Sequence, residues 1–252
     1  MKLISLNVEG SKHWDLINPF LEKEQPDVVC LQEVYEDDAV QLAQRLKMRL
    51  AVAPMVLYPD AATQTYRKMC VAMLSRLPID TIAIQDYHLS GDAIQNYDGA
   101  NEYTVDKTIR RRLLSANINH DGKTFTVATT HFTWTPDGLP RDYQYAAAEK
   151  LLAVLEKFPE VMVCGDFNMP RGVNDIYELF AKKYYDAIPA IYRSSVDPNI
   201  HRSHSNPAIA ARLAGFMIDY LFLTKGYAAK DVRLESGVSD HCAIVATVEI
   251  AA

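Results

Sequence analysis

Short apolar or alternating segments recur along the chain between turn residues, and they predict β-strands. We expect strands over 2–8, 27–33, 69–75, 79–85, 216–223 and 242–250. Two further strands are expected on either side of His120-Asp121-Gly122, whose composition is typical of a hairpin turn. The apolar letters VMVC at 161–164 also predict a buried strand, which runs directly into the sequence GDFN.

Four segments have the periodicity or the capping signals of helices, at 18–25, 36–48, 141–158 and 175–184. The first is expected to begin with Asn18 as its N-cap and Pro19 at the first helical position. Segments 87–107 and 191–208 are expected to be irregular. Strands outnumber helices, and no linker or repeat divides the chain. We therefore expect one domain over 1–252, with two sheets packed together and helices outside.

Composition and charge narrow the classes of function. The chain has 252 residues, of which 49% are hydrophobic, and no apolar run is long enough to span a bilayer, so no membrane span is expected. The first residues predict a strand rather than a signal peptide. The net charge of −6 argues against a protein that clamps long duplexes through phosphate contacts alone. Contact with nucleic acid is expected to be local, or the substrate is small.

All four cysteines lie in apolar runs without the spacing of a metal site: Cys30, Cys70, Cys164 and Cys242. We expect buried, reduced thiols, which favours a cytoplasmic location.

Six apolar, strand-like segments each carry polar residues, although a buried strand favours apolar ones. These residues are Asn7, Glu33, His131, Asp166, Asn168, Asp219, Asp240 and His241. An unpartnered buried polar group costs about 1–3 kcal/mol, and gathered carboxylates repel one another. A divalent cation resolves both problems, and oxygen ligands without clustered cysteines favour Mg²⁺ or Mn²⁺. A hard cation with histidines and amides suits hydrolysis of phosphate esters.

Each of these residues also has an ordinary explanation when it is taken alone. Asn7 is typical of a turn or cap, and a single His131 is more often a partly buried histidine with a partner than a catalyst. Asp219 is harder to explain in this way, because a carboxylate inside an apolar strand needs a partner.

Seven short strings occur in a characteristic order: LNVEG, LQEV, VAMLSRLPI, TTHFTW, GDFN, IDYLF and SDH. Together they resemble the motifs of the endonuclease/exonuclease/phosphatase superfamily, also called the deoxyribonuclease-I-like fold, over essentially the whole chain. The resemblance implies an α/β fold that is a four-layer α-β-β-α sandwich of two packed mixed β-sheets with outer helices. It also implies that the site lies at one end of the sandwich.

The resemblance implies a metal site as well, with Mg²⁺ as cofactor and Mn²⁺ as an alternative. Glu33 would bind the cation directly. Asn7 would sit beside the cation and the scissile phosphate, and Asp240 would support a metal or the histidine network. The number of metals stays open.

The catalytic roles that the resemblance implies fall on five residues. Asp166 would orient or deprotonate the attacking water, and Asn168 would help to position it. Asp219 would hold the tautomer of His241, which would contact the phosphate or act as base. His131 would stabilise phosphate oxygens or assist the leaving group. The base stays open between Asp166 and His241.

Candidates for substrate binding are less distinct. Alternation in the RRR sequence puts Arg110 and Arg112 on one face, where they either reach substrate phosphate or form a solvated surface, and the solvated surface is slightly favoured. Trp134 either forms an aromatic wall of the site or packs against the core. The segment 192–206, with His201, Arg202 and His204, is either a basic substrate loop or ordinary surface.

Three functions remain open. The leading hypothesis is a Mg²⁺-dependent phosphodiesterase or nuclease that acts on a nucleic-acid end or a short single strand. The second is a phosphatase or lipid-headgroup phosphodiesterase with a small substrate, which the acidic net charge favours. The third is a catalytically inactive binding module. The expected partner is a phosphate ester, nucleic acid among the candidates, and no obligate protein partner is inferred.

Overall fold

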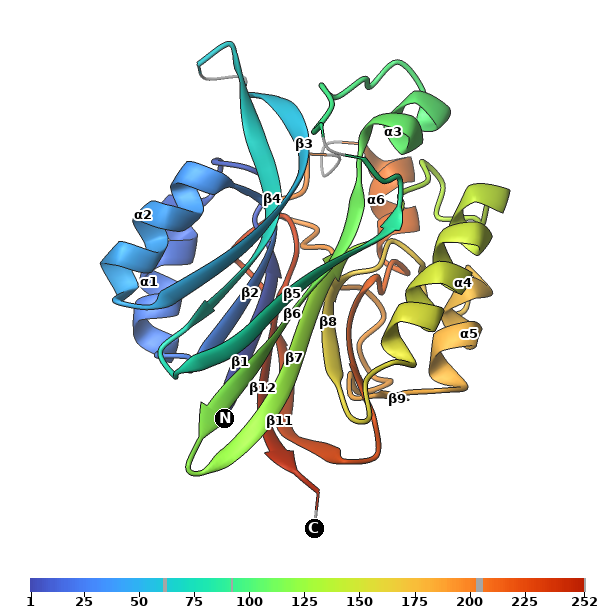
Figure 1. Ribbon diagram of the computed structural model, residues 1–252. Coiled ribbons are helices and arrows are strands. Elements are labelled where there is room, and N and C mark those ends of the chain that lie inside the picture. Colours follow the sequence, from blue (N-terminus) through green and yellow to red (C-terminus); the bar gives the residue numbers. More distant parts are fainter. Residues whose placement is uncertain (61–62, 92, 203–205, 252) are drawn as a thin grey trace.

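The computed structural model describes residues 1–60, 63–91, 93–202 and 206–251. Two mixed β-sheets of six strands each pack face to face, with helices on the outer faces (Figure 1). The first sheet has the strand order β11-β12-β1-β2-β4-β3. Its strands are β1 (Lys2–Asn7), β2 (Val28–Tyr35), β3 (Arg49–Asp60), β4 (Thr65–Ser75), β11 (Tyr227–Glu235) and β12 (Ala243–Ile250).

The second sheet has the order β5-β6-β7-β8-β10-β9. Its strands are β5 (Ile79–His88), β6 (Arg111–His120), β7 (Lys123–His131), β8 (Met162–Asp166), β9 (Tyr185–Asp186) and β10 (Asp219–Leu223). One central pair in each sheet is parallel, β1–β2 in the first and β7–β8 in the second, whereas the other neighbours are antiparallel. The carboxyl ends of each parallel pair therefore meet at one edge of its sheet.

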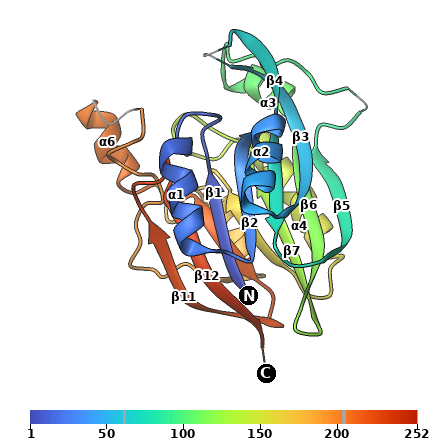
Figure 2. The same cartoon turned by 90° about the vertical axis from the view of Figure 1, so that its left-hand side faces the viewer.

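Helices complete the four layers. Helices α1 (Trp14–Glu24) and α2 (Glu36–Leu46) cover the first sheet, and α4 (Asp142–Leu155) and α5 (Ile176–Ala181) cover the second (Figure 1). The shorter α3 (Glu102–Thr108) and α6 (Pro207–Leu213) lie at the end opposite the start of β1 and the end of β12 (Figure 2). The expected α-β-β-α sandwich is confirmed. No helix in the described part of the chain is both long and apolar enough to cross a membrane.

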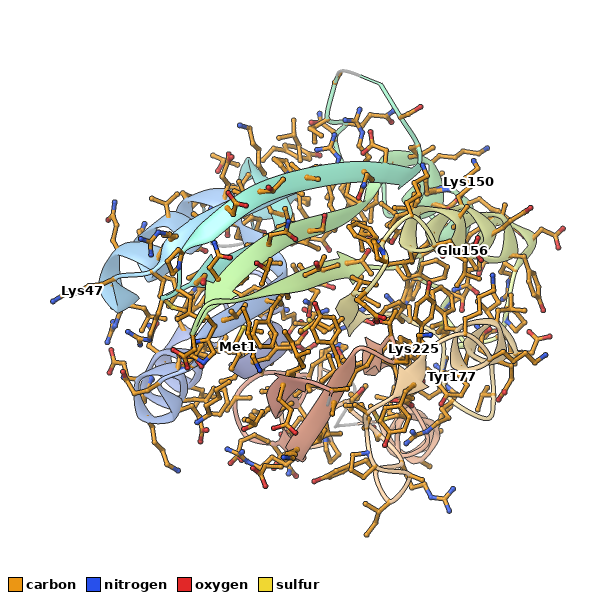
Figure 3. All side chains as sticks on the ribbon, turned by 60° about the horizontal axis from the view of Figure 1, so that its bottom comes forward. Met1, Lys47, Lys150, Glu156, Tyr177 and Lys225 are labelled. Atoms are coloured by element: carbon orange, nitrogen blue, oxygen red, sulfur yellow. The ribbon has the colours of Figure 1, made fainter. Side chains whose placement is uncertain are left out.

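Alternating side chains of the central strands build two cores. Leu3 of β1 packs in the cluster between the sheets, whereas Ile4 packs in the cluster under α1 and α2. Side chains fill the space between the sheets (Figure 3). A polar contact also crosses this space, because Gln32 Nε2 donates to Thr129 Oγ1 at 3.0 Å. The relative position of the two sheets is thus fixed by packing and by a buried hydrogen bond.

Several element boundaries differ from expectation. Helix α1 begins at Trp14 rather than Asn18, so Pro19 lies inside it. The apolar side chains of Ile17, Phe20 and Leu21 are buried against the sheet, and this packing outweighs the hydrogen bond that Pro19 cannot donate. The expected irregular segment 87–107 contains most of α3, which Asn101 begins with a capping box.

Strands β3 and β11 were not expected, and both lie at an edge of the first sheet. Strand β3 carries two prolines, which edge strands tolerate, and β11 carries charges and has little buried surface. The hairpin turn between β6 and β7 is confirmed. Asp121 and Gly122 both have positive φ, at 50° and 72°, as its two-residue turn requires.

Gly165 in β8 allows the central parallel pair to approach closely. Its φ is +142°, and an added Cβ would lie 2.0 Å from the carbonyl oxygen of Thr130 in β7. Gly165→Ala should therefore lower the free energy of unfolding by about 4 kcal/mol or more, as measured by denaturant unfolding. The control is Gly122→Ala, where φ is +72° and no atom lies within 4 Å of the added Cβ. Its expected loss is about 1–2 kcal/mol, and equal losses would contradict the steric explanation.

Candidate active site

The polar residues expected from the sequence converge where the two parallel strand pairs end. Asn7 ends β1, and Glu33 lies in the adjacent β2. In the second sheet, His131 ends β7 and is paired in register with Asp166, which ends β8. The two pairs face each other across the sandwich, so each sheet supplies one half of the site.

A cavity of about 910 Å³ opens over this junction. Its polar lining includes Glu33, Arg111, His131, Asp240 and His241. The rest of its wall is largely apolar or aromatic: Tyr35, Met55, Val56, Tyr58, Met69, Tyr97, Val105, Ile109 and Trp134. The cavity is large enough for a small organic phosphate ester.

Two site residues are held in the left-handed backbone region, which side chains other than glycine rarely adopt. Glu33 has φ 56°, at a register shift between Leu31 and Val34, and Asn168 has φ 50°. A bulge of this kind re-aims a side chain that regular pairing would direct elsewhere. Such conformations cost about 1–3 kcal/mol each and are typical of functional sites.

Asn7 links the two sheets. Its Nδ2 donates to Glu33 Oε1 at 3.2 Å and to Asp166 Oδ2 at 3.1 Å, while its Oδ1 accepts from the Glu9 amide at 3.1 Å. The oxygen that a cation would need is thus engaged by the backbone. In this geometry Asn7 holds the two carboxylates together, and the second lone pair of its Oδ1 is left for a cation.

Asp166 is 2% exposed and accepts from the Asn168 amide at 2.9 Å. Burial and the neighbouring carboxylates of Asp219 and Glu33 raise the pKa of Asp166 to about 7, against the opposing effect of His241. Asn168 is also buried, and its Nδ2 donates to the carbonyl oxygen of Phe132 at 3.2 Å. The side chain of Asn168 is therefore oriented by the loop that follows β7.

His241 and Asp219 form a buried pair. His241 Nδ1 lies 2.8 Å from Asp219 Oδ2, which also accepts from Ser195 Oγ at 2.6 Å. Burial alone would lower the pKa of His241, but Asp219, Asp240 and Asp166 raise it well above its usual value. These carboxylates therefore favour the protonated ring, whose Nε2 lies 3.9 Å from Asp166 Oδ2.

The pKa of His131 is shifted in the opposite direction. Burial, Arg111 and His241 all lower its pKa, which falls well below the usual value, so the ring is neutral. His131 Nε2 lies 3.6 Å from Asp166 Oδ2 and 3.8 Å from Glu33 Oε1, beyond hydrogen-bond distance. The two buried histidines beside Asp166 therefore have pKa values shifted in opposite directions.

The expected arginine pair does not reach the cavity. Arg112 Nε donates to Asp86 Oδ1 at 2.6 Å, and Arg110 Nη2 donates to the carbonyl oxygen of Ala93 at 3.1 Å. Neither residue lines the cavity, and Arg110 is only 6% exposed, so it forms no solvated surface. Of the three consecutive arginines, it is Arg111, on the other face of β6, that lines the cavity.

Trp134 is exposed and lines the cavity, whereas Phe132 is buried in the core. The rings of Tyr58 and Tyr97, not singled out from the sequence, pack with centroids 4.4 Å apart on the cavity wall. His201 and Arg202 also line the cavity. His204, the third basic residue expected in that loop, lies outside the described residues.

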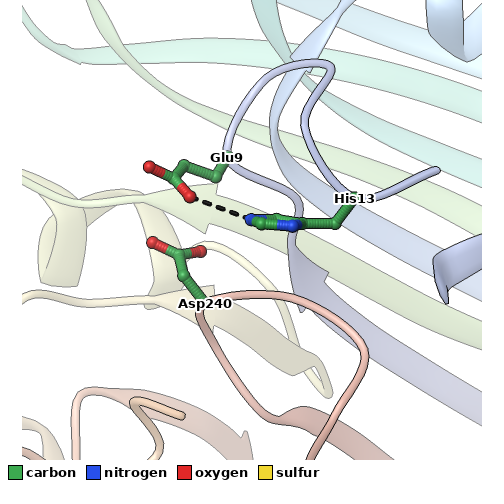
Figure 4. Close-up of side chains that lie close together, drawn as sticks. All are labelled: Glu9, His13 and Asp240. Atoms are coloured by element: carbon green, nitrogen blue, oxygen red, sulfur yellow. Dashed lines mark hydrogen bonds and ion pairs between the residues drawn. The ribbon is translucent and has the colours of Figure 1, made fainter. Parts of the chain in front are cut away.

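A second cluster of possible ligands lies beside the first. Glu9 Oε2 is 2.9 Å from His13 Nε2, and the Asp240 carboxylate points toward the same pair (Figure 4). Hydrogen bonds from Lys12 and His13 lower the pKa of Glu9 although burial opposes them. Lys12 therefore already supplies a positive charge there. Glu9 and His13 were not predicted, because they lie in a loop without periodicity.

The donor set fits a divalent cation. Ligand atoms of Glu33, His131 and Asp166 lie within 4.8 Å of one another, and two of the three residues are buried. Burial, Glu9 and Glu33 also raise the pKa of Asp240, although His241 opposes this. Crowded carboxylates whose pKa values are raised in this way would be stabilised by a hard cation.

Comparison with known proteins gives a consistent result. The model of the "Endonuclease/Exonuclease/phosphatase family" matches residues 4–241. No match was found among curated protein sequences.

Solved structures match over nearly the whole chain. A family protein from Leptotrichia buccalis C-1013-b has 18% identity and a TM-score of 0.72, with 99% of this chain and 100% of that chain covered. The human nocturnin catalytic domain with bound sulfate has 20% identity and a TM-score of 0.70, covering 100% and 93%. D. rerio TDP2 with a single-strand DNA product has 17% identity and a TM-score of 0.67, covering 99% and 98%.

Proposed function

The chain belongs to the endonuclease/exonuclease/phosphatase family, whose members hydrolyse phosphate esters with divalent metals, and we therefore propose that it is a metal-dependent phosphodiesterase. The observation that carries the proposal is the buried Asp166 carboxylate, which is gathered with Glu33, His131 and His241 under an open cavity. A pKa of about 7 makes this carboxylate a base matched to neutral solution.

Glu33 would hold the cation, with Asp240 as a further carboxylate. Mg²⁺ suits these oxygen ligands, and Mn²⁺ is the alternative. When bound, such a cation offsets the charge of the phosphate and polarises its P–O bonds.

The chain's own residues supply the proton chemistry of in-line attack by water. Asp166 orients the water and accepts its proton, because the raised pKa of the other candidate, His241, favours the form that already carries a proton. His241 donates from Nε2 to a phosphoryl oxygen, while Asp219 holds its other nitrogen. The neutral His131 assists the leaving oxygen by hydrogen bonding.

A nucleic-acid end or a short single strand is the proposed substrate. The aromatic rings of Tyr58, Tyr97 and Trp134 on the cavity wall offer stacking surfaces for bases. The net charge of −6 favours contact with only a few phosphates. The same acidity supports the second candidate, a phosphatase or headgroup phosphodiesterase with a small substrate.

A hydrolysis panel separates these functions. The purified protein is assayed with Mg²⁺, Mn²⁺ or chelator on single- and double-stranded DNA, RNA, bis-p-nitrophenyl phosphate and p-nitrophenyl phosphate. We expect metal-dependent cleavage of diesters and of single strands. Cleavage of monoesters alone would make the protein a phosphatase. Metal binding with no hydrolysis on the panel would contradict the proposal and favour the inactive module.

Glu33 should dominate cation affinity. A cation at about 100 times its Kd stabilises a protein by about 2.7 kcal/mol, so Mg²⁺ or Mn²⁺ should raise the melting temperature of the wild type. Glu33→Gln should abolish most of this rise, because a charged ligand becomes a neutral one. The control is Glu249→Gln, a half-exposed residue paired with Lys230 on β11 and far from the cavity lining. An unchanged metal response in Glu33→Gln would remove Glu33 from the metal site.

A further inference from the structure

Arg111 is the largest of the fully buried side chains. It is 1% exposed, stands at the start of β6 and lines the cavity next to His131. Its Nη1 donates to the carbonyl oxygen of His131 at 3.2 Å, and its Nε is buried without a hydrogen-bond partner. Among the described residues, no carboxylate forms an ion pair with this guanidinium.

Two partly buried arginines among the described residues show how such a charge is usually compensated. Arg67 is paired with Asp60 at 2.7 Å, and Arg112 is paired with Asp86 at 2.6 Å. A buried charge without a counter-ion costs several kcal/mol, and a protein normally avoids that cost by pairing. The carboxylates that act on Arg111, including Asp166 and Glu33, do so only at longer range. The missing partner of Arg111 is therefore an anion that the folded chain does not itself supply.

The position of Arg111 indicates where that anion binds. Its contact with the His131 backbone puts the guanidinium in the polar part of the cavity lining, on the same side as His131 and near the acidic residues that would hold a cation. A guanidinium is a planar fork with five N–H donors, and its geometry matches the oxygens of a phosphate. The acidic residues alone would repel a phosphate, and the buried guanidinium of Arg111 supplies a fixed positive charge that attracts one.

We propose that Arg111 binds a phosphoryl oxygen of the substrate with the guanidinium N–H groups that the protein leaves unpaired. The proposal rests on the proposed function for the identity of the anion, but the buried and uncompensated charge is independent of it. Arg111 then contacts the phosphate in addition to the metal site, and this contact does not require a bound cation.

The test measures binding separately from hydrolysis. Wild type, Arg111→Met, Arg111→Lys and Arg76→Met are unfolded thermally in chelator with increasing inorganic phosphate. Arg76 also donates to backbone carbonyls, those of Pro26 and Leu46, and lies outside the cavity lining. Phosphate should raise the melting temperature of wild type and Arg76→Met, raise it less in Arg111→Lys, and leave Arg111→Met unchanged.

A second readout distinguishes binding from a structural role. Without phosphate, Arg111→Met should melt at or above the wild-type temperature, because an apolar chain replaces a desolvated charge. A fall in melting temperature with phosphate stabilisation intact, in either Arg111 variant, would overturn the proposal. On bis-p-nitrophenyl phosphate, kcat/KM of Arg111→Met should fall about 10- to 100-fold, the value of a charged hydrogen bond, and Arg111→Lys should recover part of it.

The outcomes separate this inference from the proposed function. Wild-type hydrolysis that Arg111→Met retains in full, with phosphate stabilisation unchanged, would overturn the role of Arg111 and leave the proposed function standing. Phosphate binding that depends on Arg111, in a protein that hydrolyses no ester, would support the anion site and overturn the proposed function.

Discussion

Asp166→Asn should lower kcat by about 10²- to 10⁴-fold, the usual contribution of a positioned general base. The carboxylate is buried between two histidines, and its pKa of about 7 suits it to accept a proton from water. Asparagine keeps the size of the side chain and removes the base. The measurement is steady-state kcat on the best ester of the panel, and a variant that keeps more than about a tenth of wild-type kcat would exclude Asp166 as the base.

The control for this variant is Asp186→Asn, which alters a buried carboxylate outside the cavity lining. It should retain kcat even if the loss of the partner of Arg171 lowers stability. Unfolding in chelator adds a test of the pKa itself. The pKa of Asp166 is about 7 in the folded protein against 3.8 as its reference, so ionisation costs stability as pH rises from about 4 to 7. Asp166→Asn should lose this pH-dependent cost.

His241→Ala and Asp219→Asn should each reduce kcat by about 10²- to 10⁴-fold. Asp219 fixes the tautomer of His241 and is the strongest group favouring its charged form. Removal of the carboxylate therefore lowers the pKa of His241 and frees its ring. Because the two residues act as one unit, the double variant should be no slower than the slower single variant.

The measurement is a double-mutant cycle in kcat, together with an NMR titration of His241 in wild type and Asp219→Asn. Ser195→Ala is the graded control, because it removes only the hydroxyl that donates to Asp219. It should have a smaller effect than either member of the pair. Losses that multiply in the double variant would show that Asp219 and His241 act independently.

Much of the site could be predicted because its residues are polar where the surrounding sequence is apolar. Asp219 begins one apolar strand and Asp166 ends another, so a functional role was the simplest explanation for these two carboxylates. The order of the motifs then indicated the family and its two-sheet architecture. Loop residues gave no such signal. Ser195 acts through a tertiary contact with Asp219, and Glu9 pairs with His13 in a loop that has no periodicity.

The three consecutive arginines show the limit of periodicity. Alternation separated Arg111 from Arg110 and Arg112, which both lie near Asp86. Alternation does not state which face is inside, because that depends on how β6 packs against the rest of the sandwich. The predicted start of α1 was wrong for a similar reason, since burial of the helix's apolar face outweighed the local signal of Asn18 and Pro19.

Strand β12 lies between β1 and β11, so Ile4 is paired with Val245 across nearly the whole length of the chain. Pairings of such long sequence separation form slowly, because a large loop must close before any contact stabilises it. His241 is carried into place just ahead of this strand. We expect refolding protein to regain secondary structure well before it regains turnover. Until β12 docks, β1 exposes an unpaired edge, and the chain is then most prone to aggregate.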